Sequence, residues 1–258
     1  MNSSPFYESM NVPNRSLANR VAVVTGASRG VGRAAALALA EAGAHVIAVA
    51  RTVGGLEELD DAIRAIGGAA TLVPLDLKDY PAIDRLGAAI YERWGKLDML
   101  LGNAGLPGVV TPLSHLEPKV YDEVMAVNVT ANWRLIRSLD PLLRQSDAGR
   151  ALFVTSDEAE RRRPFWGIYS ASKAALQALV ETYAKELTGT TATANLFDPG
   201  PLRTRLRAKG RPGEDPETVR PSETVAPDIV RMLSPDFAGN GVIFRVADRS
   251  TTELLAPT

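Results

Sequence analysis

The sequence predicts a single α/β domain in which helices cover both faces of a parallel sheet of seven strands. Two observations carry this prediction. Continuous apolar runs, such as residues 21–24 and 45–50, are typical of parallel strands that are buried on both faces. Helical segments separate these runs, and strands that alternate with helices favour right-handed crossovers and a doubly wound sheet.

The predicted elements follow one another along the chain with short connections. Strands are predicted over residues 21–24, 45–50, 70–75, 97–101, 151–155, 191–197 and 242–246. Helices are predicted from the end of the turn at residues 25–32 to about residue 41, over 56–66, from 79 to about 94, around 121–143 and over 169–187. We expect residues 1–19, which are mostly polar, to form a flexible N-terminal arm and residues 20–258 to form the single domain.

Composition argues against several classes of function. The 29 Lys and Arg residues balance 30 Asp and Glu residues, so the chain lacks the positive excess expected of a nucleic-acid-binding protein. There is no cysteine and only two histidines, His45 and His115, so we predict no metal site. No apolar run reaches membrane-spanning length, and we expect a soluble, cytoplasmic protein without a membrane or nucleic-acid partner.

A glycine-rich turn joins the first predicted strand to the first helix. Glycines let a ligand approach the backbone closely, and the N-terminus of the helix offers free N–H groups and a positive dipole end. In this strand–turn–helix setting, a phosphate-binding turn of the Rossmann type is favoured over a plain turn. The sequence of the turn is Thr25-Gly26-Ala27-Ser28-Arg29-Gly30-Val31-Gly32.

Polar residues and glycines also follow the other predicted strands. Asp76 follows the third strand, Asn103 the fourth and Ser156 the fifth, and the turn Pro199-Gly200 follows the sixth. Ligands of doubly wound folds bind beyond the carboxyl ends of the strands. We therefore expect these residues to converge with the glycine turn on one site.

Tyr169 and Lys173 lie four positions apart in a helical segment, so their side chains share one face of the helix. A tyrosine titrates near pH ~10, and roughly three units, about 4 kcal/mol, of stabilisation of the phenolate would let it exchange protons near neutrality. A lysine charge about 4 Å away, at an effective dielectric constant of about 20, supplies roughly that energy. The alternative, on the pair alone, is a core tyrosine beside a solvated lysine.

Taken together, these residues resemble the single-domain short-chain dehydrogenase/reductase family over about residues 17–246. The glycine turn, with the spacing TGxxxGxG, is similar to the family's cofactor loop, and Asn103-Ala104-Gly105 is similar to its central-strand motif. Pro199-Gly200 with Thr204 is similar to the loop that touches the nicotinamide end of the cofactor. The residues that match the catalytic set are Asn128, Ser156, Tyr169 and Lys173.

The resemblance implies an oxidoreductase that transfers a hydride between a nicotinamide and a carbonyl or alcohol substrate. Tyr169 would exchange the proton of the substrate oxygen while Ser156 hydrogen-bonds that oxygen. Lys173 would lower the tyrosine pKa and hold the nicotinamide ribose, and Asn128 would anchor a water in the proton relay. The candidate cofactor-binding residues are Gly26, Ser28, Arg29, Gly30, Val31, Gly32, Arg51, Asp76, Leu77, Asn103, Ala104, Gly105, Tyr169, Lys173, Pro199, Gly200 and Thr204.

The residue after the second predicted strand favours NADP over NAD as the cofactor. In dinucleotide folds an acid about 20 residues beyond the glycine loop binds the ribose 2′-hydroxyl, whereas an arginine accommodates a 2′-phosphate. Here the strand ends at Ala50 and Arg51 follows, while Arg29 could approach the same phosphate from the glycine turn. The alternative is that both arginines are ordinary surface residues.

The family's pattern changes at two places. Gly102 replaces the first asparagine of the common Asn-Asn-Ala-Gly, for which we expect a local effect. The segment from Ala247 onward lacks the usual glycine pair, which favours a dimer over a tetramer. The helices around residues 121–143 and 169–187 carry apolar or small residues on more than one face, so we expect a homodimer or homotetramer.

Two basic runs, residues 161–163 and 203–211, flank the expected substrate region. Their arginines could bind an acidic substrate, but a solvated lid whose charges are partly balanced by Glu214, Asp215 and Glu217 is favoured. For the whole chain, the alternative to an enzyme is a catalytically idle nucleotide-binding or scaffold protein on the same fold.

Overall fold

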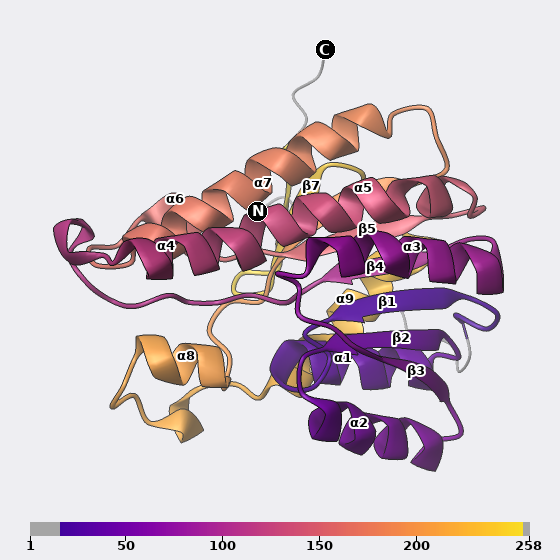
Figure 1. The fold of residues 1–258 in the computed structure, drawn as a ribbon, viewed down its shortest axis with the longest axis horizontal. Helices are drawn as coiled ribbons and strands as arrows, with labels where there is room; N and C mark the ends of the chain where they lie inside the picture. Colours follow the sequence, from indigo (N-terminus) through magenta and orange to yellow (C-terminus); the bar gives the residue numbers. More distant parts are fainter. Residues whose placement is uncertain (1–15, 255–258) are drawn as a thin grey trace.

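The structure of the protein is a computed structural model that describes residues 16–254, so most of the predicted N-terminal arm lies outside the described residues. One sheet runs through this part of the chain, and it contains more strands than the seven predicted (Figure 1). The strands are β1 (Val21–Thr25), β2 (His45–Ala50), β3 (Ala69–Pro74), β4 (Met99–Gly102), β5 (Arg150–Val154), β6 (Thr193–Asp198), β7 (Val242–Arg245) and β8 (Ser250–Glu253).

Helices connect most of these strands, as the alternating pattern predicts. The α-helices among residues 16–254 are α1 (Gly30–Glu41), α2 (Val53–Ala65), α3 (Tyr80–Trp94), α4 (Pro118–Met125), α5 (Ala131–Arg144), α6 (Glu158–Arg161), α7 (Gly167–Glu186), α8 (Arg205–Gly210) and α9 (Ala226–Leu233). A π-helical segment, Ala126–Thr130, joins α4 to α5, where the sequence predicted one continuous helix. Short 3₁₀ turns lie at Leu113–His115, Pro216–Thr218 and Ser222–Val225.

The sheet has the strand order β3-β2-β1-β4-β5-β6-β7-β8. The first seven strands pair in parallel, which confirms the predicted class of fold. After β3 the chain crosses to β4 on the other side of β1, so the direction of winding changes between β1 and β4. Such a change opens a crevice beyond the carboxyl ends of the two strands, where ligands of these folds bind.

The prediction of seven parallel strands is wrong in one respect, because β8 is an additional antiparallel strand beside β7. The turn between them places Arg249 at φ 57°, and the Asp248 side chain accepts a hydrogen bond from the Ser250 N–H at 3.0 Å. β8 is polar and half-exposed at the edge of the sheet. It therefore lacks the continuous apolar run by which the buried strands were recognised.

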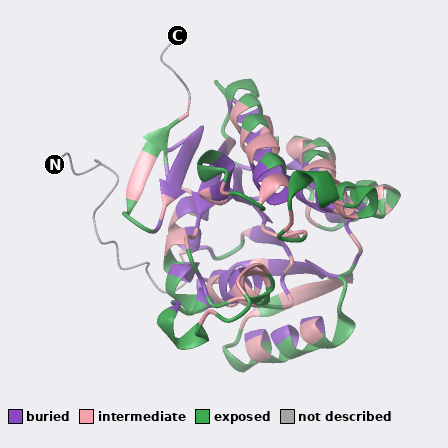
Figure 2. Cartoon of the chain, turned by 90° about the vertical axis from the view of Figure 1, so that its left-hand side faces the viewer, coloured by how far each residue is buried: buried purple, intermediate pink, exposed green. Residues whose placement is uncertain are grey.

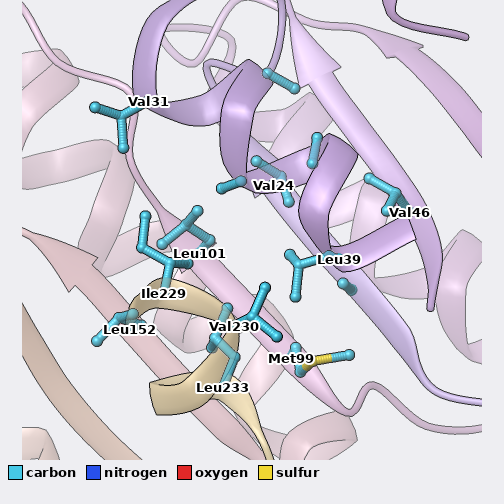
Figure 3. Packing of buried hydrophobic residues seen from close by; sticks show 14 of the residues in the cluster. Val24, Val31, Leu39, Val46, Met99, Leu101, Leu152, Ile229, Val230 and Leu233 are labelled. Atoms are coloured by element: carbon cyan, nitrogen blue, oxygen red, sulfur yellow. The ribbon is translucent and has the colours of Figure 1, made fainter. Parts of the chain in front are cut away.

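Alternate residues of the strands face two separate cores. In β1, Ala22 and Val24 belong to the core beneath α1, α2 and α9, whereas Val21 and Val23 belong to the core beneath α3, α5 and α7. Figure 3 shows the first of these cores, in which Leu39 of α1 and side chains of α9 meet those of the strands. The strands are buried between the helix layers, and the outer faces of the helices are exposed (Figure 2).

None of the helices between residues 16 and 254 combines the length and the apolar character needed to span a membrane.

Candidate active site

A cavity of about 610 Å³ opens beyond the carboxyl ends of the parallel strands β1 to β6. It brings together every predicted site residue except Gly32 and Asn128. The predicted residues that line it are Gly26, Ser28, Arg29, Gly30, Val31, Arg51, Asp76, Leu77, Asn103, Ala104, Gly105, Ser156, Tyr169, Lys173, Pro199, Gly200 and Thr204.

The glycine turn between β1 and α1 requires its glycines. Gly26 and Gly30 have positive φ angles of 67° and 55°, which side chains disfavour. A Cβ atom at Gly32 would lie 2.3 Å from the Gly26 carbonyl oxygen, so the turn can close only around a glycine there. Gly32 therefore shapes the turn without lining the cavity, whereas Gly30 and Val31, the first residues of α1, line it. The residues present fit a phosphate-bearing cofactor.

The loop after β4 is tied to this turn by Thr25 and Asn103. The Thr25 hydroxyl accepts hydrogen bonds from the backbone N–H groups of Asn103 and Ala104, at 2.9 and 3.1 Å, and donates one to the Leu101 carbonyl at 3.2 Å. The Asn103 side-chain amide donates to the Thr25 carbonyl at 2.8 Å. These bonds hold the carboxyl ends of β1 and β4 together at the crevice. Asn103 thus has a structural role as well as a place in the cavity wall.

Two arginines stand at the end of the cavity formed by β1 and β2. Arg51 directly follows β2, no acidic residue occupies the end of that strand, and the Arg51 guanidinium lies 4.0 Å from the Asp76 carboxylate. Arg29 is exposed in the glycine turn, and its side chain makes no ion pair with any residue in the described part of the chain. Both guanidinium groups are therefore available to an anion at this end.

Tyr169 lies in the first turn of α7, and its ring is buried beside Ser156, which follows β5 closely. Burial of the phenol raises the pKa of Tyr169; the Ser156 hydroxyl opposes this change, and the carboxylates of Asp198, Glu158 and Asp157 add to it. The spacing of Tyr169 and its lysine predicted a lowered pKa. In this structure burial is the largest effect on the phenol, and it leaves the pKa of Tyr169 raised instead.

Lys173 lies one turn further along α7 and is also buried. Its ammonium donates a hydrogen bond to the Val154 carbonyl at 2.8 Å and lies 5.8 Å from the centre of the Tyr169 ring. Burial lowers the pKa of Lys173 to about 8, and the carboxylate of Asp198 opposes that change. The side chain is therefore a buried cation in the site, not the solvated lysine of the alternative interpretation.

Asn128 lies in the π-helical segment and does not reach the cavity, although it is fully buried. Its side-chain oxygen accepts a hydrogen bond from the Leu106 N–H at 2.8 Å. Its amide donates to the Leu106 carbonyl and to the Ser172 hydroxyl, both at 2.9 Å. Asn128 therefore clamps the loop after β4 to α7, and π-helical segments are frequent at functional sites.

Comparisons with known proteins agree with this geometry. The sequence model of the family described as short chain dehydrogenase matches residues 20–215. The chain belongs to this family. The uncharacterized oxidoreductase YciK of Escherichia coli strain K12 is 36% identical over 228 residues, which are 87% of this chain and 90% of that protein.

Solved structures of short chain dehydrogenases have the same fold. One from Pseudomonas syringae superposes with a TM-score of 0.87 at 37% identity and covers 90% of this chain and 96% of that one. Another, from Shigella flexneri 2a, is a complex with NADP; its TM-score is 0.86 at 33% identity, and the match covers 90% of this chain and 98% of that one. As a short-chain dehydrogenase, this protein is an oxidoreductase.

The cavity of this short-chain dehydrogenase also contains a carboxylate that the sequence analysis did not single out. Asp198 ends β6, is buried, and accepts a hydrogen bond from the Gly200 N–H at 2.9 Å. Burial raises the pKa of Asp198. Its position directly before Pro199-Gly200 was the available signal, but burial next to Tyr169 and Lys173 could be seen only in the structure.

The first basic run is only partly solvated. Arg163 turns inward, where its guanidinium pairs with Glu158 and lies 3.1 Å from Asp157, whereas Arg161 pairs with Asp157 at 3.1 Å from an exposed position. Glu158 is buried, and Arg163 lines the cavity. A charged cluster of Asp157, Glu158 and Arg163 therefore forms one wall of the cavity of this dehydrogenase.

The second basic run belongs to a lid, which we define as residues 201–221. Its arginines are partly balanced by acids, as the favoured interpretation expects: Arg207 lies 2.5 Å from Glu214, and Arg203 lies 2.9 Å from Glu217. Thr204 caps α8 by accepting a hydrogen bond from the Arg207 N–H at 3.1 Å. The lid arginines that line the cavity are Arg203, Arg205, Arg207 and Arg211.

Proposed function

We propose that this protein is an NADP(H)-dependent oxidoreductase that interconverts a carbonyl compound and an alcohol, with Tyr169 as the general acid and base. The observation that carries the proposal is that Tyr169, Lys173 and Ser156 line the same cavity as the glycine turn. A nucleotide held at the turn and a substrate held at the tyrosine would then share one enclosed space.

The choice of NADP rests on two arginines, Arg51 at the end of β2 and Arg29 in the glycine turn. Arg51 and Arg29 line the cavity, and no acid stands where a ribose 2′-hydroxyl would need one. The guanidinium groups would hold a 2′-phosphate through charge-assisted hydrogen bonds. The NADP complex of the Shigella flexneri neighbour supports the same choice.

The roles of the site residues follow from their chemistry. When bound, the cofactor supplies or accepts the hydride. A raised pKa keeps the Tyr169 phenol protonated near neutral pH, the form that donates a proton to the oxygen of a carbonyl substrate. The Ser156 hydroxyl would hydrogen-bond that oxygen, and Lys173 would hold ribose hydroxyls and favour the phenolate after proton transfer. Asn128 would keep the loop at Leu106 and α7 in place, and it would order the proton relay.

Purified protein tested with NADPH against a panel of aldehydes, ketones and acidic carbonyl compounds would decide the proposal. With at least one compound we expect oxidation of NADPH, which is monitored by the loss of NADPH absorbance. Turnover with NADH at equal concentration should be slower. Binding of NADPH without turnover of any compound, together with no oxidation of the corresponding alcohols by NADP, would favour the alternative of a nucleotide-binding protein without catalytic activity.

A further inference from the structure

The residue just before α7 places an indole ring beside the candidate catalytic tyrosine. Trp166 and Tyr169 meet edge to face, with ring centres 5.9 Å apart, and both line the cavity. Trp166 is only partly exposed, although it lies in the connection between Ser156 and Tyr169. Its ring therefore forms a fixed wall next to the phenol.

The lid contacts the same indole from the other side. A Cβ atom at Gly210, the last residue of α8, would lie 2.2 Å from Cη2 of Trp166 and within 3.1 Å of two other ring atoms. Only a glycine lets the backbone of α8 come this close to the ring. Figure 1 shows α8 in a segment that stands apart from the two helix layers, below α4 and to the left of α1 in this view. Trp166 is thus a point at which this segment reaches α7.

The other attachments of the lid lie at its base. The Arg203 N–H donates to the Arg220 carbonyl at 2.8 Å and so joins the two ends of the lid to each other, and a Cβ atom at Gly30 would lie 3.5 Å from the Thr204 methyl group. The pair of Arg207 and Glu214 joins two parts of the lid to each other and not to the rest of the protein. The contact of Gly210 with Trp166 joins the end of α8 to the residue before α7, and it would therefore help to position this part of the lid.

We propose that Trp166 determines substrate size: its indole, held between Tyr169 and Gly210, limits the group that can lie beside the carbonyl carbon. The inference rests on the proposed carbonyl chemistry. We therefore expect the substrates to be aldehydes, or ketones with one small substituent. A bulky second substituent would displace the indole and lift α8. A smaller side chain at position 166 should widen this space.

The size limit is tested by comparing a small aldehyde with a bulky aryl ketone as substrates. Trp166→Ala should raise the ratio of kcat/KM for the ketone to kcat/KM for the aldehyde by about tenfold or more, and Trp166→Phe should raise it less. Phe165→Ala is the matched control, because Phe165 is the adjacent aromatic residue, is 55% exposed and does not line the cavity. A ratio that stays unchanged in Trp166→Ala would overturn the inference.

The lid contact is tested without turnover by limited digestion with trypsin, which cleaves after the basic residues of the lid. Trp166→Ala should be cut after Arg207 or Lys209 about tenfold faster than wild type, because this part of the lid opens more often. Thermal unfolding checks that Trp166→Ala is folded. If it is not folded, Trp166→Phe takes its place in the digestion. Equal rates of cleavage in the lid would refute the contact. A wild-type protein that reduces no carbonyl compound would refute the proposed function and the size limit, and the digestion would still decide the contact.

Discussion

At the scale of single residues, the site is defined by charged groups that the fold buries around one phenol. Asp198 raises the pKa of both Tyr169 and Lys173, and it is itself buried at the end of β6. The Asp198 carboxylate accepts a hydrogen bond from the Gly200 N–H. Because an asparagine oxygen can accept the same bond, the charge of Asp198 can be removed while the turn is kept.

We expect Asp198→Asn to move the alkaline limb of the pH–rate profile for carbonyl reduction to lower pH. Without the carboxylate, the pKa values of Tyr169 and Lys173 both fall. Reduction needs the Lys173 ammonium to favour the phenolate, so the rate is lost as pH rises through the pKa of Lys173, about 8, and without the carboxylate that loss begins at lower pH. The measurement is kcat/KM from about pH 6 to 10. A limb that stays in place, or moves to higher pH, would show that Asp198 does not act on the pair.

Cofactor choice is also decided by single residues. Replacing Ala50 by Asp and Arg51 by Ala should weaken NADPH binding about ten- to hundredfold and change NADH binding little, because each charge-assisted contact is worth roughly 1.5–3 kcal/mol. Dissociation constants for both cofactors, measured by titration, provide the comparison. If the wild-type protein already binds NADH as tightly as NADPH, the assignment of the two arginines is wrong.

At the scale of elements, the sequence predicts the helices and strands that have a clear apolar pattern or a recognisable capping residue. The apolar runs located β1 and β2, and Asp79 caps α3 through its hydrogen bond with the Ala82 N–H. The π-helical segment was not predicted, because an extra residue in a helix leaves the apolar pattern nearly unchanged. Asn128 was identified only by resemblance, since its bonds to Leu106 join segments far apart in the sequence.

The Asn128 clamp predicts a loss of stability that can be measured. Asn128→Ala should lower the free energy of unfolding by roughly 1–3 kcal/mol, because it leaves the N–H and C=O groups of Leu106 without their partner. Ser172→Ala is the matched control, since it removes one of the three bonds of the Asn128 side chain and should cost less. Denaturant unfolding measures both. Equal values for Asn128→Ala and wild type would show that the clamp does not stabilise the loop.

At the scale of the whole molecule, the strand order brings residues from the ends of six parallel strands, β1 to β6, to one cavity. The sequence predicted this convergence because the carboxyl ends of parallel strands share one edge. It could not predict which way the lid or Arg163 turns, since charged runs carry no pattern that distinguishes an inward side chain from a solvated one. Those contacts depend on the positions of α6, α7 and α8 relative to one another.

Assembly remains a prediction at this scale, and we expect a homodimer or homotetramer. The outer faces of α4 and α5 expose aromatic side chains, among them Tyr121 at 47% and Trp133 at 42% exposure. Light scattering at micromolar concentration should give twice or four times the mass of the chain, and Trp133→Asp should shift it towards the monomer. Tyr91→Asp on α3, where the tyrosine is 63% exposed, is the control and should leave the mass unchanged. A wild-type monomer would refute the prediction.

The role of Tyr169 is tested most directly by Tyr169→Phe, measured for both turnover and NADPH affinity. The substitution keeps the ring against Trp166 and removes only the transferable proton. We expect turnover with a carbonyl substrate to be abolished while the dissociation constant for NADPH stays nearly the same, whereas Lys173→Met should impair both. A Tyr169→Phe enzyme that keeps most of its rate would contradict the mechanism.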